Sequence, residues 1–294
     1  MHWKKKRVTP LDVTLTLLLL GLGAYIVYRL TVALNYKWQW SIIPTYLVRY
    51  DHEQERWVAN LLLEGLYTTI RLSVWATLLA AVLGLVFGLM RTSRRLLFRL
   101  TAGLYVELIR NTPQLVLVFI FYFFVSSQVL PMLGIEESIR SLPAAAQTWI
   151  ARFAAGPDLI TAFFSGVLTI ALFQGAYITE IVRSGIESVE EGQWEASYAL
   201  GLSRCQQLIW IILPQAGRKV LPPLANEFIN TIKYSAIVSI ISIQELTFQG
   251  MQIMSSTQVT IEIWLTITLM YLVLCLLLSL SVRALEKHLN RGHA

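Results

Sequence analysis

The residues with the clearest chemical pattern lie between two long apolar segments. Residues 195–214 have the sequence E-A-S-Y-A-L-G-L-S-R-C-Q-Q-L-I-W-I-I-L-P. Glu195 offers a carboxylate near a helix start, where it can bind a basic residue of a partner or backbone N–H groups. Trp194 and Tyr198 are four residues apart and therefore share one helix face as a bulky knob. The pattern favours recognition of another protein.

The same stretch predicts two short helices. The first covers residues 193–200, and Gly201 is expected to end it in the left-handed conformation. The second covers about 203–212 and runs to Pro214, which suits a bend toward the membrane. The alternative is an amphipathic helix on the bilayer surface, but that interpretation gives no reason for the I-I-L-P end of the stretch.

A second polar pattern lies inside an apolar segment. Asn226, Asn230 and Lys233 are spaced i, i+4 and i+7, which places them on one helical stripe. Three neighbours widen the stripe: Glu227, Thr231 and Tyr234. Lys233 lies about 15 Å beyond Pro223, near the middle of a bilayer core about 30 Å thick. A lysine there costs about 2.5–3.5 kcal/mol, so it should face protein or water.

Two interpretations of this stripe stay open. Asn226, Asn230, Lys233 and Tyr234 could form the polar wall of a substrate path, in which lysine and neutral amides would suit a substrate carboxylate. Alternatively, Lys233 pairs with an acid and serves assembly.

Catalytic, cofactor and metal motifs are missing from the sequence. It contains no G-x-x-x-x-G-K-[ST], H-E-x-x-H or G-x-S-x-G pattern, so no catalytic residue, cofactor or metal site is predicted. The four histidines do not cluster with Cys, Asp or Glu, and Cys205 and Cys275 are not expected to form a disulfide.

The composition requires a membrane. The chain is 55% hydrophobic and 14% charged, with a mean hydropathy of +0.58. A span needs about 20 apolar residues, and six segments qualify: roughly 11–34, 63–90, 104–130, 159–182, 223–245 and 262–284. Because lipid offers the backbone no hydrogen-bond partners, the fold class is an all-α polytopic membrane protein.

The distribution of Lys and Arg predicts the orientation. With the N-terminus inside, sixteen of them fall in inner segments and six in outer ones. Both termini and the Glu195 segment are thus expected in the cytoplasm, and the net charge of +6 needs no nucleic acid to explain it. The first apolar run could be a signal peptide, but it is long enough to span and is expected to remain as an anchor.

Residues 195–214 resemble the EAA loop of bacterial ABC importer permeases. Six positions are in register: Glu195, Ala196, Gly201, Ile211, Leu213 and Pro214, while Ser197 replaces the second alanine. The resemblance implies a type I importer fold with an extra N-terminal helix. It also implies that this loop, about 186–222, docks on a separate ATPase subunit through Trp194, Glu195, Ala196, Tyr198, Gly201, Ile211, Leu213 and Pro214.

Two more stretches resemble the polar amino acid permeases. Residues 175–201 contain A-Y-I-T-E-I-V-R-S-G-I and then Gly192-Gln193 before Glu195. Residues 105–116, Y-V-E-L-I-R-N-T-P-Q-L-V, resemble the E-x-x-R-x-T-P-L-x-V of that subfamily, with Gln114 in place of a common Leu. Tyr234 stands where the family often has Asp beside the lysine, and the loss of that acid is expected to alter selectivity or gating.

The resemblance covers residues 61–289 and makes residues 1–60 an additional anchor helix with an external segment. It implies an inner-membrane subunit of an ATP-driven importer of polar amino acids, of the glutamate, glutamine or aspartate type. The subunit hydrolyses nothing itself. The implied partners are an ABC ATPase dimer, an extracytoplasmic amino-acid-binding protein, a second permease subunit (identical or a sister chain) and membrane lipids.

Other classes fit less well. A self-sufficient secondary transporter or channel is the alternative, but it predicts inverted repeats and would leave the EAA loop unused. Several motif residues also have structural interpretations. Glu180 and Arg183 could form a local ion pair, Arg110 and Pro113 could mark the start of a span, and G-x-x-x-G at Gly84 and Gly88 indicates close helix packing.

Overall fold

The computed structural model describes residues 9–29, 36–53 and 55–291, and the chain divides into two units, 1–41 and 42–294. The first unit contains α1 (Pro10–Tyr28). Thr9 and Asp12 form a capping box, in which each side chain accepts the other's backbone N–H at 3.3 and 2.8 Å. The expected span 11–34 therefore begins as predicted, and its last part lies outside the described residues.

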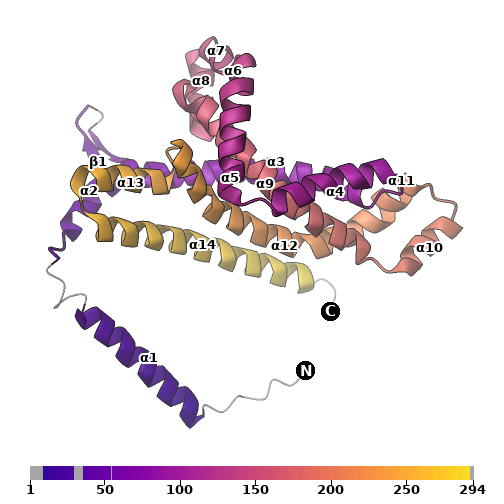
Figure 1. Ribbon diagram of the computed structural model, residues 1–294, viewed down its shortest axis with the longest axis horizontal. Coiled ribbons are helices and arrows are strands. Elements are labelled where there is room, and N and C mark those ends of the chain that lie inside the picture. The colour runs from indigo at the N-terminus through magenta and orange to yellow at the C-terminus, as the bar shows by residue number, and fades with distance from the viewer. Residues whose placement is uncertain (1–8, 30–35, 54, 292–294) are drawn as a thin grey trace. The chain divides into compact units, whose positions relative to one another are not determined.

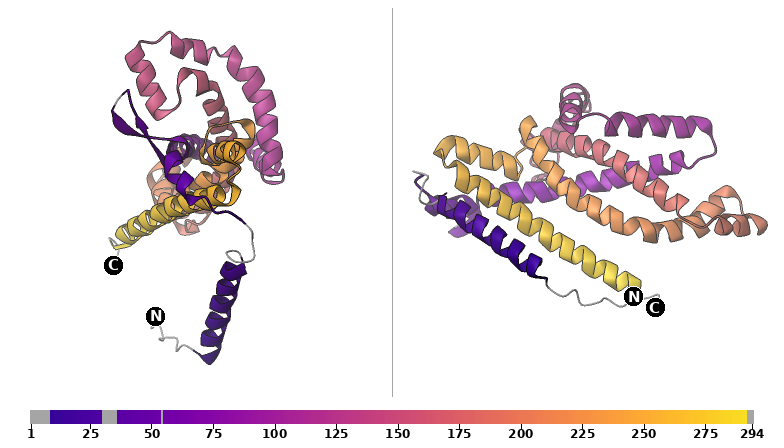
Figure 2. Two further views of the ribbon diagram at one scale, coloured as in Figure 1. Left: turned by 90° about the vertical axis from the view of Figure 1, so that its left-hand side faces the viewer. Right: turned by 60° about the horizontal axis from the view of Figure 1, so that its bottom comes forward.

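The second unit is mostly helical (Figures 1 and 2). Its elements, in order, are η2 (Trp40–Ile42, which begins in the first unit), α2 (Ile43–Leu47), β1 (Val48–Asp51), β2 (Arg56–Ala59), α3 (Leu61–Arg91), α4 (Leu96–Arg110), α5 (Gln114–Ile120), η3 (Phe121–Val129), α6 (Leu130–Met132), α7 (Ile135–Arg140), α8 (Ala144–Phe153), η4 (Pro157–Leu159), α9 (Ile160–Glu187), α10 (Glu191–Ala199), α11 (Arg204–Gln206), η5 (Gln207–Ile212), α12 (Leu213–Tyr234), η6 (Ser235–Ile241), α13 (Leu246–Thr257) and α14 (Thr260–Arg291).

The α3–α9 pair is the centre of this unit. A Cβ atom on Gly88 would lie 2.6 Å from Cγ1 of Val182, and one on Gly84 would clash with Ile178. Small residues here let the two backbones approach closely, which confirms the packing role predicted for G-x-x-x-G. The long helices α3, α9, α12 and α14 all extend lengthwise through this unit, with α14 inclined to α3 (Figures 1 and 2).

This bundle has two distinct ends. The antiparallel β1–β2 ribbon pairs Val48 with Ala59 and Asp51 with Arg56, and it lies at one end with α2 (Figure 1). We call this the hairpin end. The other end carries α10 and α11, and we call it the loop end. The ribbon is a small addition to the expected all-helical structure.

Two expected spans are broken. The span predicted over 104–130 is not one straight helix, because the chain bends by 109° between α4 and α5, around Asn111–Pro113. Pro113 lacks an N–H group and disfavours helical backbone in the residue before it, so the helix ends there. After the bend, α5 to α8 project sideways from the bundle (Figures 1 and 2).

The span predicted over 223–245 does not match one of the helices that are long and apolar enough to cross a membrane. Its α-helix begins earlier, at Leu213, and ends at Tyr234, the 3-10 helix η6 continues to Ile241, and Ser242 has a left-handed φ of 61°. Glu245 then starts α13, because its side chain accepts the Phe248 N–H at 2.9 Å. The helical backbone is therefore interrupted between η6 and α13.

Within the described residues, three helices are long and apolar enough to cross a membrane: Leu61–Arg91, Pro157–Glu187 and Thr260–Ala284. The bent α4–α5 pair makes a fourth if it counts as one span. The expected spans 63–90, 159–182 and 262–284 correspond to these three helices.

Candidate functional site

The EAA loop has the predicted glycine cap. Gly201 has φ +74°, and its N–H donates to the Tyr198 carbonyl at 2.9 Å. The Leu202 N–H donates to the Ser197 carbonyl at 3.2 Å. These two bonds form the Schellman pattern that satisfies the last carbonyls of α10. Gly201 therefore turns the chain from α10 into α11 by adopting a conformation that other residues resist.

The exposed face of α10 differs from the expected one. Tyr198 and Leu200 are 77% and 79% exposed, and Glu195 and Ala196 are exposed beside them. Glu195 makes no hydrogen bond or ion pair with the described residues. Its carboxylate is therefore available to a partner.

Trp194 does not belong to this exposed knob, contrary to the prediction. It is only partly exposed, packs against the buried apolar cluster of α9 and η5, and carries the Arg204 guanidinium 3.8 Å above its ring. Burial lowers the pKa of Arg204, with a smaller contribution from Arg94. Trp194 thus fastens α10 to the helix that follows.

The second helix of the loop is longer than predicted. It does not bend away at Pro214, because α11, η5 and α12 are consecutive segments from Arg204 to Tyr234. The turns just before Pro214 widen into the π-helical segment η5. Pro214 cannot donate to the carbonyl four residues earlier, and a widened turn tolerates that missing bond. Ile211 and Leu213 pack against the same buried cluster as Trp194.

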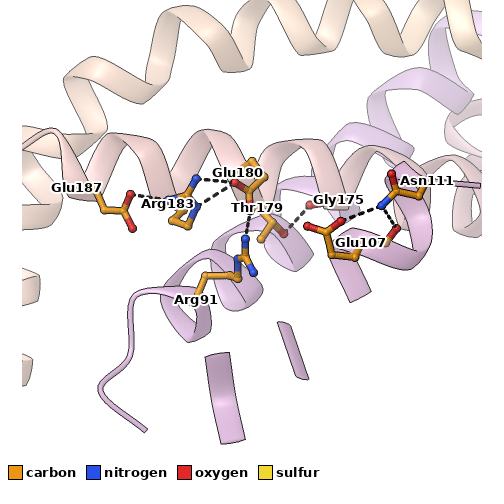
Figure 3. Close-up of polar contacts among 8 residues, drawn as sticks. All are labelled: Arg91, Glu107, Asn111, Gly175, Thr179, Glu180, Arg183 and Glu187. Carbon is orange, nitrogen blue, oxygen red and sulfur yellow. Dashed lines mark hydrogen bonds and ion pairs between the residues drawn. The ribbon is translucent and has the colours of Figure 1, made fainter. Parts of the chain in front are cut away.

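Ion pairs fix the base of the loop (Figure 3). Arg91, at the end of α3, contacts Glu180 of α9 at 3.0 Å, and Arg183 contacts the other oxygen of Glu180 at 2.8 Å. Arg183 also pairs with Glu187. The local pair predicted for Glu180 and Arg183 is confirmed, and Arg91 extends it to a second helix. The ion pairs therefore join the end of α3 to the last turns of α9, from which the loop begins.

The polar stripe of α12 lies on an exposed face. Asn226 and Lys233 are exposed, Asn230 is partly exposed, and Tyr234 is 38% exposed. Asn230 donates to the Glu227 carboxylate at 3.3 Å. Tyr234 instead packs edge-on against Phe173 of α9, at 5.7 Å between ring centroids. Tyr234 therefore forms the edge of the stripe that faces α9.

Lys233 lies at the other edge of the stripe and is exposed. It makes no ion pair or hydrogen bond with the part of the chain that the structure describes. The assembly interpretation required an acid, and this subunit does not provide one among the described residues. A partner for the ammonium group has to come from another molecule or from water.

A groove of about 610 Å³ runs between α9 and α12 on the side of Glu227. Its polar lining includes Arg110, Glu180, Lys219 and Glu227. The Arg110 guanidinium lies 5.4 Å from the ring centroid of Tyr177, and Lys219 donates to the Ser188 carbonyl at 2.6 Å. The sequence alone does not indicate this group of residues. Arg110 comes close to Tyr177 of α9 only because the helix ends after Arg110.

A sequence profile described as "Binding-protein-dependent transport system inner membrane component" matches residues 57–291. The chain belongs to this family. The permease is 36% identical over 231 residues to the glutamine transport system permease protein GlnP of Escherichia coli (strain K12), covering 78% of this chain and 93% of that protein. It is 32% identical to the probable glutamine ABC transporter permease protein GlnM of Bacillus subtilis (strain 168), over 80% of this chain and 95% of that protein.

Solved structures agree with this assignment. A crystal structure of an amino acid ABC transporter with histidines superposes on the permease with a TM-score of 0.61 and 33% identity, over 78% of this chain and 94% of that chain. The MetNI methionine ABC transporter in an inward-facing conformation has the same fold at 17% identity and a TM-score of 0.56. The permease is thus the inner-membrane component of a binding-protein-dependent transport system, with a type I importer fold.

Proposed function

We propose that this permease carries polar amino acids of the glutamate, glutamine or aspartate type into the cytoplasm, driven by ATP hydrolysis on a separate subunit. Relatives named for glutamine transport support the substrate class, at 32% and 36% identity. An L-cystine transport system permease protein, TcyB of Bacillus subtilis (strain 168), is 33% identical. Glutamine and cystine, the substrates in the names of these relatives, are both polar zwitterions.

The observation that carries the mechanism is the exposed face of α10. Glu195, Tyr198 and Leu200 project from a helix that Gly201 caps and that Trp194 anchors. A charged and aromatic surface of this kind fits a cleft in an ATPase partner, with the Glu195 carboxylate meeting a basic residue. The ion pairs at Glu180 then pass a displacement of α10 to α3 and α9.

In this proposal both termini and the loop end are cytoplasmic, and the hairpin end receives amino acids from an external binding protein. A second permease subunit completes the path, because the stripe of Asn226, Asn230, Lys233 and Tyr234 is exposed in a single subunit. The unpartnered Lys233 supports a role for this stripe in the substrate pathway, where its ammonium group would meet a substrate carboxylate.

Reconstitution with the cognate ATPase and binding protein tests the function. ATP-dependent uptake of radiolabelled L-glutamine, L-glutamate or L-aspartate into proteoliposomes is expected, and no uptake of any polar amino acid would refute it. Glu195→Arg and Tyr198→Ala should reduce both ATPase co-purification and uptake. Glu190→Arg is the matched control, since Glu190 is also exposed but precedes α10. Equal losses in all three variants would argue against docking on the Glu195 face.

A further inference from the structure

A second polar cavity lies toward the hairpin end, away from the groove beside Glu227. It has a volume of about 230 Å³, is partly open, and is bordered by α3, the end of α8, the start of α9 and the backbone break before α13. Its polar lining includes Glu64, Arg71, Ser242 and Gln249. Irregular backbone at membrane depth occurs where it is buried in protein or lines a water-filled space. The break at Ser242 therefore suits a cavity wall.

Arg71 is a cation that forms no ion pair with a carboxylate among the described residues. Its guanidinium donates to the Ala151 carbonyl at 2.7 Å and to the Thr68 hydroxyl at 3.1 Å, and it lies 4.4 Å from the Tyr67 ring centroid. Its buried Nε has no hydrogen-bond partner among the described residues. A guanidinium presents N–H donors in a fixed fork that matches a carboxylate. The Nε–H group of that fork makes no hydrogen bond to the described residues.

Arg71 is also held in place. Tyr67, Arg71 and Trp75 are spaced four residues apart on α3, and each donates to a carbonyl at the C-terminal end of α8. The Tyr67 hydroxyl reaches the Arg152 carbonyl at 2.7 Å, and the Trp75 indole N–H reaches the Phe153 carbonyl at 2.8 Å. This clamp fixes the guanidinium, so little conformational freedom remains to be lost when a ligand binds.

Gln249 brings an unpartnered acceptor to the same cavity. Its side chain is 4% exposed, and its buried Oε1 accepts no hydrogen bond from the described residues. Gly65 makes this position possible, because a Cβ there would lie 2.9 Å from Cγ of Gln249. A buried amide oxygen without a donor is costly, so a ligand N–H group would stabilise it.

Glu64 adds a negative charge at a defined spacing. It precedes Arg71 by seven residues, which puts both on one face of α3, about 10 Å apart along the axis. The two side chains form no ion pair with each other. The cavity therefore offers a cation at one end, a carboxylate at the other and an amide oxygen that needs a donor.

We propose that this cavity is a second amino-acid site on the hairpin-end half of the permease, in which Arg71 binds the substrate α-carboxylate while Gln249 and Glu64 bind its ammonium group. The inference rests on the proposed function and adds to it a site separate from the α12 stripe. A free zwitterion satisfies all three groups at once. An anion that lacks an N–H donor would bind Arg71 alone. A simple cation would bind only Gln249 and Glu64.

A local accessibility assay tests the proposal in the reconstituted complex. Ala162 lines the cavity from α9, so Ala162→Cys is introduced after Cys205 and Cys275, the two native cysteines, have been replaced by serine. Complexes in phosphatidylcholine nanodiscs are labelled with a small methanethiosulfonate reagent, with and without L-glutamine. We expect L-glutamine to slow labelling, and its methyl ester and N-acetyl derivative to protect at least about tenfold more weakly, because each lacks one charged contact.

Variants separate a ligand site from a purely structural clamp. Arg71→Met and Gln249→Met should each raise the half-protecting concentration of L-glutamine about tenfold or more. Leu78→Met is the matched control, because Leu78 lies on the same helix, is 55% exposed and neither lines the cavity nor belongs to the clamp, and it should leave protection within twofold. Equal loss in Leu78→Met and Arg71→Met, or unchanged protection in Arg71→Met, would overturn the site.

Two further outcomes of the labelling assay test the identity of the occupant and the link to transport. Protection that appears without amino acid when phosphatidylglycerol is added would make a lipid phosphate the occupant and overturn the proposal. If the complex imports L-glutamine but L-glutamine gives no protection at Ala162→Cys, this site fails and the proposed function stands. If it imports no polar amino acid, the proposed function itself fails.

Discussion

Replacing Gly201 with valine should uncouple the EAA loop without unfolding the permease. The residue has φ +74°, and an added Cβ would meet no heavy atom within 4 Å. The cost of a side chain is therefore conformational and not a clash. Left-handed backbone costs an ordinary residue about 1–2 kcal/mol, and a β-branched one resists it further.

The loop can escape this cost only by giving up its cap. The bonds from the Gly201 and Leu202 N–H groups, at 2.9 and 3.2 Å, are then lost, at about 0.5–1.5 kcal/mol each. In either case the folded conformation of the turn between α10 and α11 is destabilised by about 1–3 kcal/mol. This is large compared with the stability of a nine-residue helix. We expect α10 to lose its fixed direction.

The assay compares three variants in proteoliposomes. Gly201→Val should insert normally but show weak ATPase co-purification and little ATP-driven uptake, and Gly201→Ala should be intermediate. Gly201→Asn is the matched control, because asparagine tolerates left-handed backbone, and it should retain most transport. Wild-type uptake in Gly201→Val, or equal failure of the asparagine variant, would refute the reasoning from backbone conformation.

Three further predictions follow from other parts of the molecule. Lys233→Met should sharply slow uptake per assembled complex while complex yield is kept; an unchanged rate with reduced yield would restore the assembly interpretation. Cysteine at Ser203 should be protected from an impermeant thiol reagent in intact cells and cysteine at Glu53 labelled, whereas the reverse would overturn the orientation. Gly88→Val should destabilise α3–α9 packing by about 1–3 kcal/mol, because its Cβ would lie 2.6 Å from Val182, and unchanged thermal stability of the purified complex would contradict this.

The sequence predicts those features of the EAA loop that depend only on interactions between residues close in the chain. A glycine after a short helix indicates a left-handed cap by itself, and Gly201 adopts it. The orientation of Trp194 was not predictable in this way. Four-residue spacing places it near Tyr198, but Arg204 and the α9 cluster draw it inward. Those contacts arise only when α11 folds back on α10.

The helix breaks show a second limit of the sequence. Apolar residues dominate much of 104–130 and 223–245, so a span is predicted for each segment, although neither is one continuous α-helix. Pro113 gave a local signal for the first break. Nothing in the sequence marks Ser242 at φ 61°. Its conformation belongs to a turn fixed by tertiary contacts, since Glu245 accepts from Tyr271 of α14 at 2.7 Å and from Thr69 of α3 at 3.3 Å.

Both breaks lie beside polar cavities, and α9 borders each cavity. Phe163 lines the cavity near Arg71, and Tyr177 lines the groove near Glu227, about 21 Å apart along the helix axis. Between them, α9 is closed against its neighbours, because Val167 and Ile170 are buried in one apolar cluster and Phe173 in another. A substrate cannot pass through this packed interior. In the proposed function, a route between the cavities therefore follows the exposed face of the subunit, where Lys233 and Asn226 lie, and the proposed second subunit encloses it.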